Sequence, residues 1–184
     1  MKGTKIEWCD STLNPVIGCT YGCEFCYARR LNKRFGWTED FSKPQFFPER
    51  LEQLKSKKPK NIFMDSMSDI ADWKDEWIAE TFKVMKENPQ HNYLFLTKRP
   101  YIYERLKNLF HKNNVWCGAT AIDKFSCIMN DCLLDKVHDC NTFLSIEPLL
   151  EEVGFGLGPY VDWVIVGAET GNRKGKVKPK PEWV

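Results

Sequence analysis

The sequence has no apolar run that approaches the roughly 20 residues needed for a transmembrane helix, and no signal-peptide core near its N-terminus. It also lacks a large excess of either charge, because 27 lysines and arginines face 25 aspartates and glutamates, for a net charge of +2. Internal repeats and low-complexity linkers are missing as well. These absences predict a cytoplasmic globular protein with no membrane partner, and they leave the class of any other partner open.

Cysteine, in contrast, is plentiful. Eight of the 184 residues are cysteine, while 42% are hydrophobic and 14% aromatic. This length and composition fit one globular domain over residues 1–184, ending in a basic tail at about residues 171–184. Thiols in the cytoplasm are kept reduced, so disulfides are not expected, and metal binding is the better interpretation of cysteines that cluster.

Three of the cysteines do cluster. Cys19, Cys23 and Cys26 have C-x3-C-x2-C spacing, with the aromatic Phe25 directly before the last. Thiolates this close in one loop can converge on a single soft metal centre, either zinc or an iron–sulfur cluster. A structural zinc site needs four protein ligands, so a distant residue such as Cys9 would have to complete it. On a cluster of four irons, three ligands would leave one iron open to a small molecule.

Short apolar runs alternate with amphipathic segments along most of the chain. Strands are predicted at Asn61–Asp65, Asn92–Thr97, Val115–Thr120, Thr142–Ile146 and Val161–Val166, after a less regular first strand region between Lys5 and Ile17. Helices are predicted over Tyr27–Arg34, Glu49–Ser56 and Asp75–Asn88, from Pro100 onward, and on the apolar face Phe125, Ile128, Met129, Cys132 and Leu133. Residues 38–48 and the glycine-rich link at 151–159 are expected to be loops. Six strands alternating with helices predict an α/β fold with a parallel sheet covered by helices.

The cysteine loop and the six βα units resemble the radical S-adenosylmethionine (SAM) superfamily. In that superfamily three cysteines bind a [4Fe-4S] cluster, and SAM chelates the fourth iron through its amino and carboxylate groups. The resemblance implies a partial (β/α)6 TIM-like barrel with its chemistry at the carboxyl ends of the strands. It also implies reductive cleavage of SAM to a 5′-deoxyadenosyl radical, with one electron from an external flavodoxin- or ferredoxin-type reductant.

A closer resemblance, to the phage Gp37/Gp68 family (DUF5131), covers essentially the whole chain. It rests on eight phrases in the family's order: Ile6-Glu7-Trp8, Leu13-Asn14-Pro15, Gly18-Cys19-Thr20, Cys26-Tyr27-Ala28, Ser66-Met67-Ser68-Asp69, Leu96-Thr97-Lys98-Arg99-Pro100, Leu144-Ser145-Ile146-Glu147-Pro148-Leu149 and Trp163-Val164-Ile165-Val166-Gly167-Ala168-Glu169. Many members space the first two cysteines further apart, whereas this chain has the radical SAM spacing, which favours cluster binding. Members also usually continue beyond Trp183 with a helix and an aromatic strand. This chain stops at Val184, so it is expected to be either a naturally short form or a fragment that lacks the C-terminal extension.

The superfamily resemblance implies SAM contacts in the cysteine loop and at the strand ends, by Phe25, Ser66, Ser68, Asp69, Thr120, Ser145, Glu147, Gly167 and Glu169. The hydroxyls and carboxylate of residues 66–69 would accept hydrogen bonds from the SAM amino group. Phe25 and the segment 167–169 would lie beside the adenine, and the other three residues would bind the ribose or the methionine carboxylate. Alternatives stay open, because Ser and Asp also cap helices, a strand-end Glu can pair with Lys98 or Arg99, and a glycine can make a tight turn.

The basic tail adds Arg173, Lys174, Lys176, Lys178 and Lys180. Such a run is usually a solvated segment. Together with Arg29, Arg30, Lys98 and Arg99, it could instead receive a nucleic-acid or another phosphate-bearing substrate. The predicted function is therefore a radical SAM enzyme acting on an unidentified substrate, for which nucleic acid or another phosphate-containing molecule is one candidate. The alternative is a non-catalytic phage accessory protein, stabilised by zinc or a cluster, that binds nucleic acid.

Overall fold

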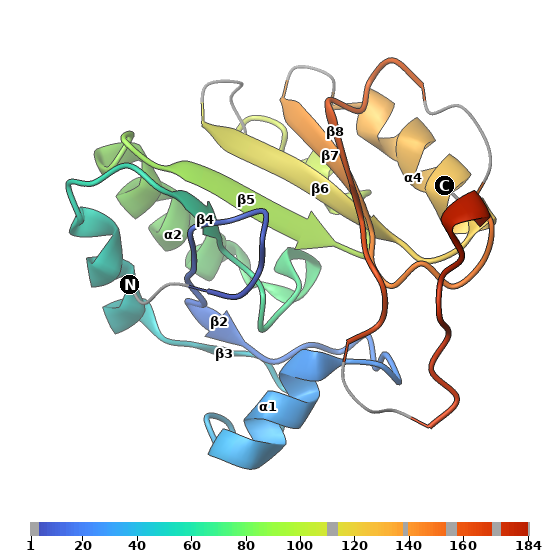
Figure 1. The fold of residues 1–184 in the computed structure, drawn as a ribbon. Coiled ribbons are helices and arrows are strands. Elements are labelled where there is room, and N and C mark those ends of the chain that lie inside the picture. Colours follow the sequence, from blue (N-terminus) through green and yellow to red (C-terminus); the bar gives the residue numbers. More distant parts are fainter. Residues whose placement is uncertain (1–3, 110–113, 138–139, 154–157, 171–173, 184) are drawn as a thin grey trace. The chain divides into compact units, whose positions relative to one another are not determined.

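The computed structural model describes residues 4–109, 114–137, 140–153, 158–170 and 174–183 (Figure 1). The chain forms two compact units, Met1–Phe95 and Leu96–Val184, each with its own strands and helices. Within the described ranges, no helix has both the length and the apolar character needed to cross a membrane.

Unit 1 is built on three parallel strands, the last of which ends two residues after the unit boundary at Phe95. They are β1 (Ser11–Thr12), β4 (Asn61–Phe63) and β5 (Asn92–Thr97), paired in the order β1-β4-β5. Helix α2 (Asp75–Glu87) precedes β5 and turns one apolar face inward. Within the core, the Phe95 ring stacks on Phe82 at 5.5 Å between centroids and meets Trp73 edge-on at 6.0 Å. This aromatic packing joins α2 to β5.

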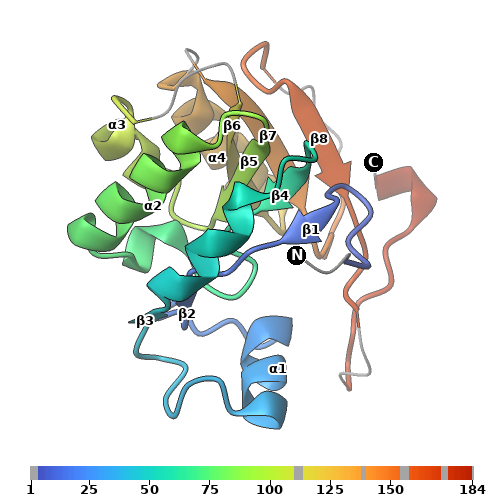
Figure 2. The ribbon, with the colours of Figure 1, turned by 90° about the vertical axis from the view of Figure 1, so that its left-hand side faces the viewer.

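The segment between β1 and β4 holds a small antiparallel pair of strands and the first α-helix. Strand β2 (Val16–Ile17) pairs antiparallel with β3 (Gln45–Phe46), and α1 (Tyr27–Phe35) lies between them in sequence. The 3-10 helix η1 (Pro48–Lys55) then leads to β4. Figures 1 and 2 both show α1 at the lower end of unit 1, away from α2. The expected loop at 38–48 thus contains a strand, and the helix expected at 49–56 is a 3-10 helix.

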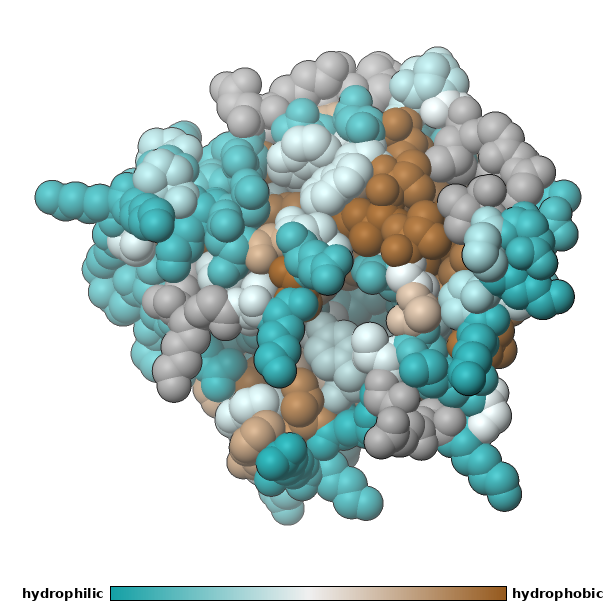
Figure 3. Space-filling view, viewed as in Figure 1, coloured by the Kyte–Doolittle hydropathy of each residue, from teal (hydrophilic) through white to brown (hydrophobic). Residues whose placement is uncertain are grey.

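Unit 2 also has three parallel strands, β6 (Val115–Ala121), β7 (Asn141–Ile146) and β8 (Trp163–Val166), in that order. Its helices are α3 (Ile102–Leu106), α4 (Lys124–Asp135) and the 3-10 helix η3 (Pro181–Trp183). A Cβ at Gly118 in β6 would lie 2.1 Å from the Phe143 ring, so glycine lets that ring pack against the β6 backbone. Figure 3 shows an apolar brown area where Figure 1 draws β8, whose Val164 and Val166 side chains are exposed.

Helix α4 turns the apolar face predicted from its sequence toward solvent. Phe125 is 73% exposed, and Ile128 and Met129 are 44% exposed each. The buried side chains of α4 are Cys127, Asn130 and Leu134. The buried Asn130 amide donates to the Thr120 carbonyl oxygen at 2.9 Å, which ties α4 to β6. Helical periodicity therefore predicted the helix, and a buried hydrogen bond decided which side faces inward.

The prediction of a partial (β/α)6 TIM-like barrel is wrong. The strands are parallel and mixed with helices, but a helix does not follow each strand. The connection from β1 to β4 contains the antiparallel strands β2 and β3, helix α1 and a 3-10 helix. The described part of the connection from β7 to β8 has no helix. That second connection includes Pro148, Gly158 and Pro159, which disfavour helix formation. Its residues 154–157 lie outside the described residues, and the single-domain boundary stays a prediction.

Candidate functional site

The cysteine loop begins directly after β2, at a residue that must be glycine. Gly18 has φ +117°, and a Cβ there would lie 2.8 Å from the Cα of Pro44. Its N–H donates to the Met67 carbonyl at 3.0 Å, and the next N–H, that of Cys19, donates to Phe41 at 2.8 Å. The backbone at the start of the loop is therefore held on both sides before the first thiol.

The three cysteines of the loop are all partly exposed. Cys26 is the N-cap of α1, and its Sγ accepts from the Arg29 N–H at 3.3 Å. The Cys19 Sγ accepts from the Tyr21 N–H at 3.5 Å. Cys19 and Cys26 also pack against one small core cluster made of Ile17, Ala28, Phe41 and Met67. Backbone donors aimed at two of the sulfurs suit atoms that would carry negative charge as metal ligands.

The thiols do not form a closed set of ligands in this structure. Among the described residues, no group of three or more His, Cys, Asp or Glu side chains is arranged to hold a metal ion. Cys9, which the zinc alternative needs as a fourth ligand, is buried, and burial raises the pKa of its thiol to about 11. A buried, protonated thiol is a poor ligand, because metals bind the thiolate.

The segment from Ser66 to Asp69 lies beside the start of the cysteine loop. Gly18 and Ser68 form a parallel β-bridge, in addition to the hydrogen bond from Gly18 to Met67. The Tyr27 hydroxyl, at the start of α1, donates to the Ser66 carbonyl at 2.7 Å. Burial of the hydroxyl raises the pKa of Tyr27 above its ordinary value.

The polar side chains of this segment already have partners within unit 1. Asp69 is buried and caps the 3-10 helix η2 (Ile70–Asp72), accepting from the Ala71 N–H at 3.0 Å. Ser68 accepts from the Trp73 indole N–H at 3.0 Å, and Ser66 donates to the Asn14 side-chain oxygen at 3.1 Å. The capping alternative is therefore observed for Asp69, and a SAM contact would be an additional role. Phe25, on the loop, is half-buried, and its carbonyl accepts from Arg30 at 3.4 Å.

The other predicted contacts come together in unit 2, at the carboxyl ends of its strands. Thr120 of β6 is in register with Ser145 of β7, and the Ser145 hydroxyl donates to the Glu147 carboxylate at 3.1 Å. Gly167, directly after β8, packs so close to that carboxylate that a Cβ would lie 2.4 Å from its Oε1. Glu169 is buried nearby in sequence. The predicted SAM contacts thus form two groups, one in each unit.

The basic tail is only partly described, since Arg173 lies outside the described residues. Lys174, Lys178 and Lys180 are exposed, and the Lys180 ammonium lies 5.8 Å from the centre of the Trp183 ring. Whether the tail binds a polyanion stays a prediction.

Comparison with known proteins assigns the family. A family model described as a protein of unknown function, DUF5131, matches residues 3–184. The chain belongs to the DUF5131 family. No curated protein and no solved structure matches it. The resemblance indicated by the eight sequence phrases is confirmed at this level, and membership of the radical SAM superfamily stays a prediction.

Two side chains that the sequence did not single out restrain the DUF5131 cysteine loop and the segment 66–69 beside it. The Asp72 carboxylate of η2 accepts twice from Thr20, from its N–H at 2.8 Å and from its hydroxyl at 2.7 Å. The Asn14 side-chain oxygen accepts from the Met67 N–H at 2.8 Å as well as from Ser66. Asn14 and Thr20 both belong to the phrases shared with DUF5131, so those phrases could have identified them as functional residues. Asp72 lies outside those phrases, and only the structure identifies it.

Replacing Asp72 by alanine should loosen the cysteine loop. Both hydrogen bonds to Thr20 would be lost, and because the groups are exposed we expect a loss of about 1 kcal/mol in the free energy of unfolding. Urea denaturation measures this change. Glu80→Ala, which removes an exposed carboxylate from the middle of α2, is the matched control and should change little. Equal stability of the Asp72 variant and the control would show that the Thr20 contact does not restrain the loop.

Proposed function

We propose that this DUF5131 protein is a radical SAM enzyme. The observation that supports the proposal most is a juxtaposition in unit 1. The loop that carries Cys19, Cys23 and Cys26 runs beside the segment 66–69, to which it is joined by the Gly18–Ser68 bridge. Soft ligands for a cluster and oxygen acceptors for a ligand's ammonium group therefore lie on neighbouring backbone segments.

The chemistry of the donor set suits a [4Fe-4S] cluster. Three thiols come from one loop, all are accessible, and backbone N–H groups donate to two of the sulfurs, which is a feature that tunes cluster potentials. A cluster bound by these thiols would supply the electron for reductive cleavage of SAM, after taking it from an external flavodoxin- or ferredoxin-type reductant. The products would be methionine and a 5′-deoxyadenosyl radical, which would take a hydrogen atom from a substrate.

The protein's own residues would bind and orient SAM. Capping of η2 holds the Asp69 carboxylate in one orientation, from which it would accept from the amino group of SAM. Ser68 is held similarly by the Trp73 indole. Each of these roles is binding and positioning, and none requires the side chain to react.

The test is turnover of SAM by the protein itself. After anaerobic reconstitution with iron and sulfide, incubation with SAM and dithionite should yield 5′-deoxyadenosine and methionine, detected by liquid chromatography. Omission of dithionite should abolish both products. A protein that carries a full cluster yet releases no 5′-deoxyadenosine would reject catalysis. Colourless protein containing zinc would instead support the non-catalytic alternative.

A further inference from the structure

The segment from Tyr21 to Trp37, which follows the first cysteine and includes α1, is strongly basic. Helix α1 carries Arg29, Arg30, Lys33 and Arg34 and no acidic residue. In the whole segment the only carboxylate is that of Glu24. The segment therefore has a net charge of +3, from four cations and one anion, whereas the entire chain has +2.

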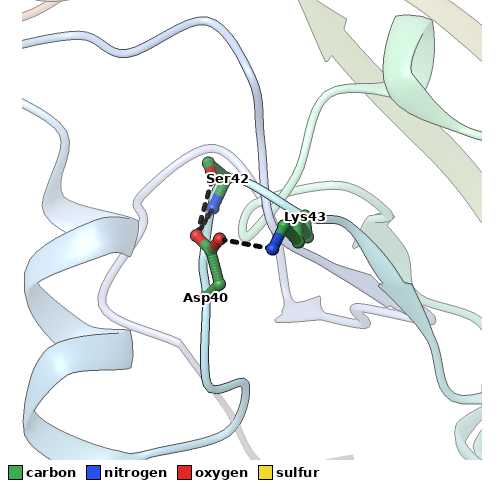
Figure 4. Close-up of polar contacts among 3 residues, drawn as sticks. All are labelled: Asp40, Ser42 and Lys43. Carbon is green, nitrogen blue, oxygen red and sulfur yellow. Dashed lines mark hydrogen bonds and ion pairs between the residues drawn. The ribbon is translucent and has the colours of Figure 1, made fainter.

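These cations are not neutralised by neighbours. No described carboxylate forms an ion pair with any of the four basic residues of α1. The nearest acidic residues after the helix are Glu39 and Asp40, and the Asp40 carboxylate already interacts with Ser42 and Lys43 (Figure 4). Its carboxylate accepts from the Ser42 hydroxyl at 2.6 Å and N–H at 2.9 Å and pairs with Lys43 at 3.4 Å, so its pKa lies below the ordinary value. Three of the four cations, those at positions 30, 33 and 34, are exposed.

The same segment carries the exposed aromatic side chains of unit 1. Among its described residues, the large apolar side chains that are exposed are Tyr21, Tyr27, Phe35 and Trp37, all within residues 21–37 and all aromatic. The rings of Phe35 and Trp37 stack at 5.1 Å between centroids, and the Arg34 guanidinium lies 5.2 Å from the centre of the Phe35 ring. In Figure 3, hydrophilic and apolar side chains are intermingled where Figure 1 draws α1.

A buried amide fixes the turn that presents the Phe35–Trp37 stack. Gly36 ends α1 in the left-handed conformation, with φ 64°, and its N–H donates to the Asn32 carbonyl at 2.7 Å. The Asn32 side chain, itself buried, makes two hydrogen bonds to the backbone of Thr38, at 2.9 and 3.0 Å. The two rings are therefore presented on a restrained turn, with little to lose in conformational entropy when a ligand stacks on them.

We propose that residues 21–37 form a binding surface for single-stranded nucleic acid. Unpaired cations attract the phosphates, and exposed rings offer flat faces on which unpaired bases stack. A membrane surface fits less well, because unit 1 exposes no large aliphatic side chain among its described residues to enter the lipid. Since Cys26 caps α1, the bound strand lies beside the cysteine loop, and its role as the substrate rests on the proposed function.

The test measures the affinity of the full chain for a fluorescein-labelled oligo-dT strand by anisotropy, over a series of salt concentrations. Trp37→Leu, which keeps apolar bulk and removes the stacking face, should weaken binding at least about fivefold, whereas Trp37→Tyr should bind nearly as the parent. The triple change Arg30→Gln, Lys33→Gln, Arg34→Gln should reduce the slope of log affinity against log salt by about 2. The matched control is Lys55→Gln, Lys57→Gln, Lys58→Gln, three exposed lysines of unit 1 outside the segment, and it should leave the slope nearly unchanged.

Three results would overturn the proposal. They are equal losses for the two triple variants, equal affinity for a duplex of the same length, and binding to anionic phosphatidylserine vesicles without binding to the oligonucleotide. Thermal unfolding of each variant confirms that it is folded. Two measurements on the parent protein separate the two proposals: iron content and 5′-deoxyadenosine formation report on the enzyme, and oligonucleotide affinity reports on the binding surface. A parent protein that binds the oligonucleotide but forms no 5′-deoxyadenosine would contradict the proposed enzyme activity and leave the proposed binding surface standing.

Discussion

Alanine at Cys23 is expected to abolish iron binding, and alanine at Cys19 or Cys26 should do the same. Each thiolate would hold its own iron, and Cys9, the nearest cysteine in sequence outside the loop, is a poor substitute because it is buried and burial raises the pKa of its thiol to about 11. Iron and sulfide per chain after anaerobic reconstitution measure the effect, together with the brown colour of the protein. Cys132→Ala removes an exposed thiol from α4 and is the matched control, which should keep full iron content.

The opposite outcome is easy to recognise. If Cys23→Ala kept the iron content of the parent, the three-thiolate site would be wrong. Tight zinc and no iron in the parent would favour a structural site, which requires a fourth ligand that the described residues do not bring to the loop.

The second large effect is expected for SAM binding. The double variant Ser68→Ala, Asp69→Asn should keep its cluster but lose most SAM cleavage, with at least about tenfold weaker SAM affinity, since a hydrogen bond to a charged group contributes about 1.5–3 kcal/mol. Calorimetric titration of reconstituted protein with SAM measures the affinity. The residues are not expected to touch iron, so iron content should match the parent.

The single variants separate SAM binding from helix capping. Asn is nearly as good an N-cap as Asp, so Asp69→Asn should retain the cap of η2 and the stability of the fold while it removes the charge. Ser68→Ala leaves the Trp73 indole N–H without its acceptor, so it should lower the free energy of unfolding by about 1–3 kcal/mol. Unchanged SAM affinity in Asp69→Asn would mean that this carboxylate only caps the helix.

Local pattern was sufficient to predict most elements. The strand at Asn92–Thr97 has the predicted bounds, and the helix predicted at Asp75–Asn88 is observed at Asp75–Glu87. Both depend on a short apolar run or a 3.6-residue repeat, which are properties of contiguous sequence. The barrel prediction failed because it assumed that strands and helices alternate along the whole chain. The connection from β1 to β4 breaks that alternation with the antiparallel pair of β2 and β3. That pairing joins Val16 with Phe46, 30 positions further along the chain, and no local pattern indicates it.

In the candidate site, too, some features follow from local sequence and others depend on contacts between distant segments. The spacing of Cys19, Cys23 and Cys26 is a local feature, and the sequence by itself determined that these thiols share one loop, that a basic helix follows them and that the family is DUF5131. Only the tertiary structure decided that Asp72 holds Thr20, that Asp69 caps η2, and that the apolar face of α4 points outward. Those outcomes depend on which polar groups find partners when distant segments meet. A carboxylate 52 residues from its donor becomes a partner only after the chain has folded.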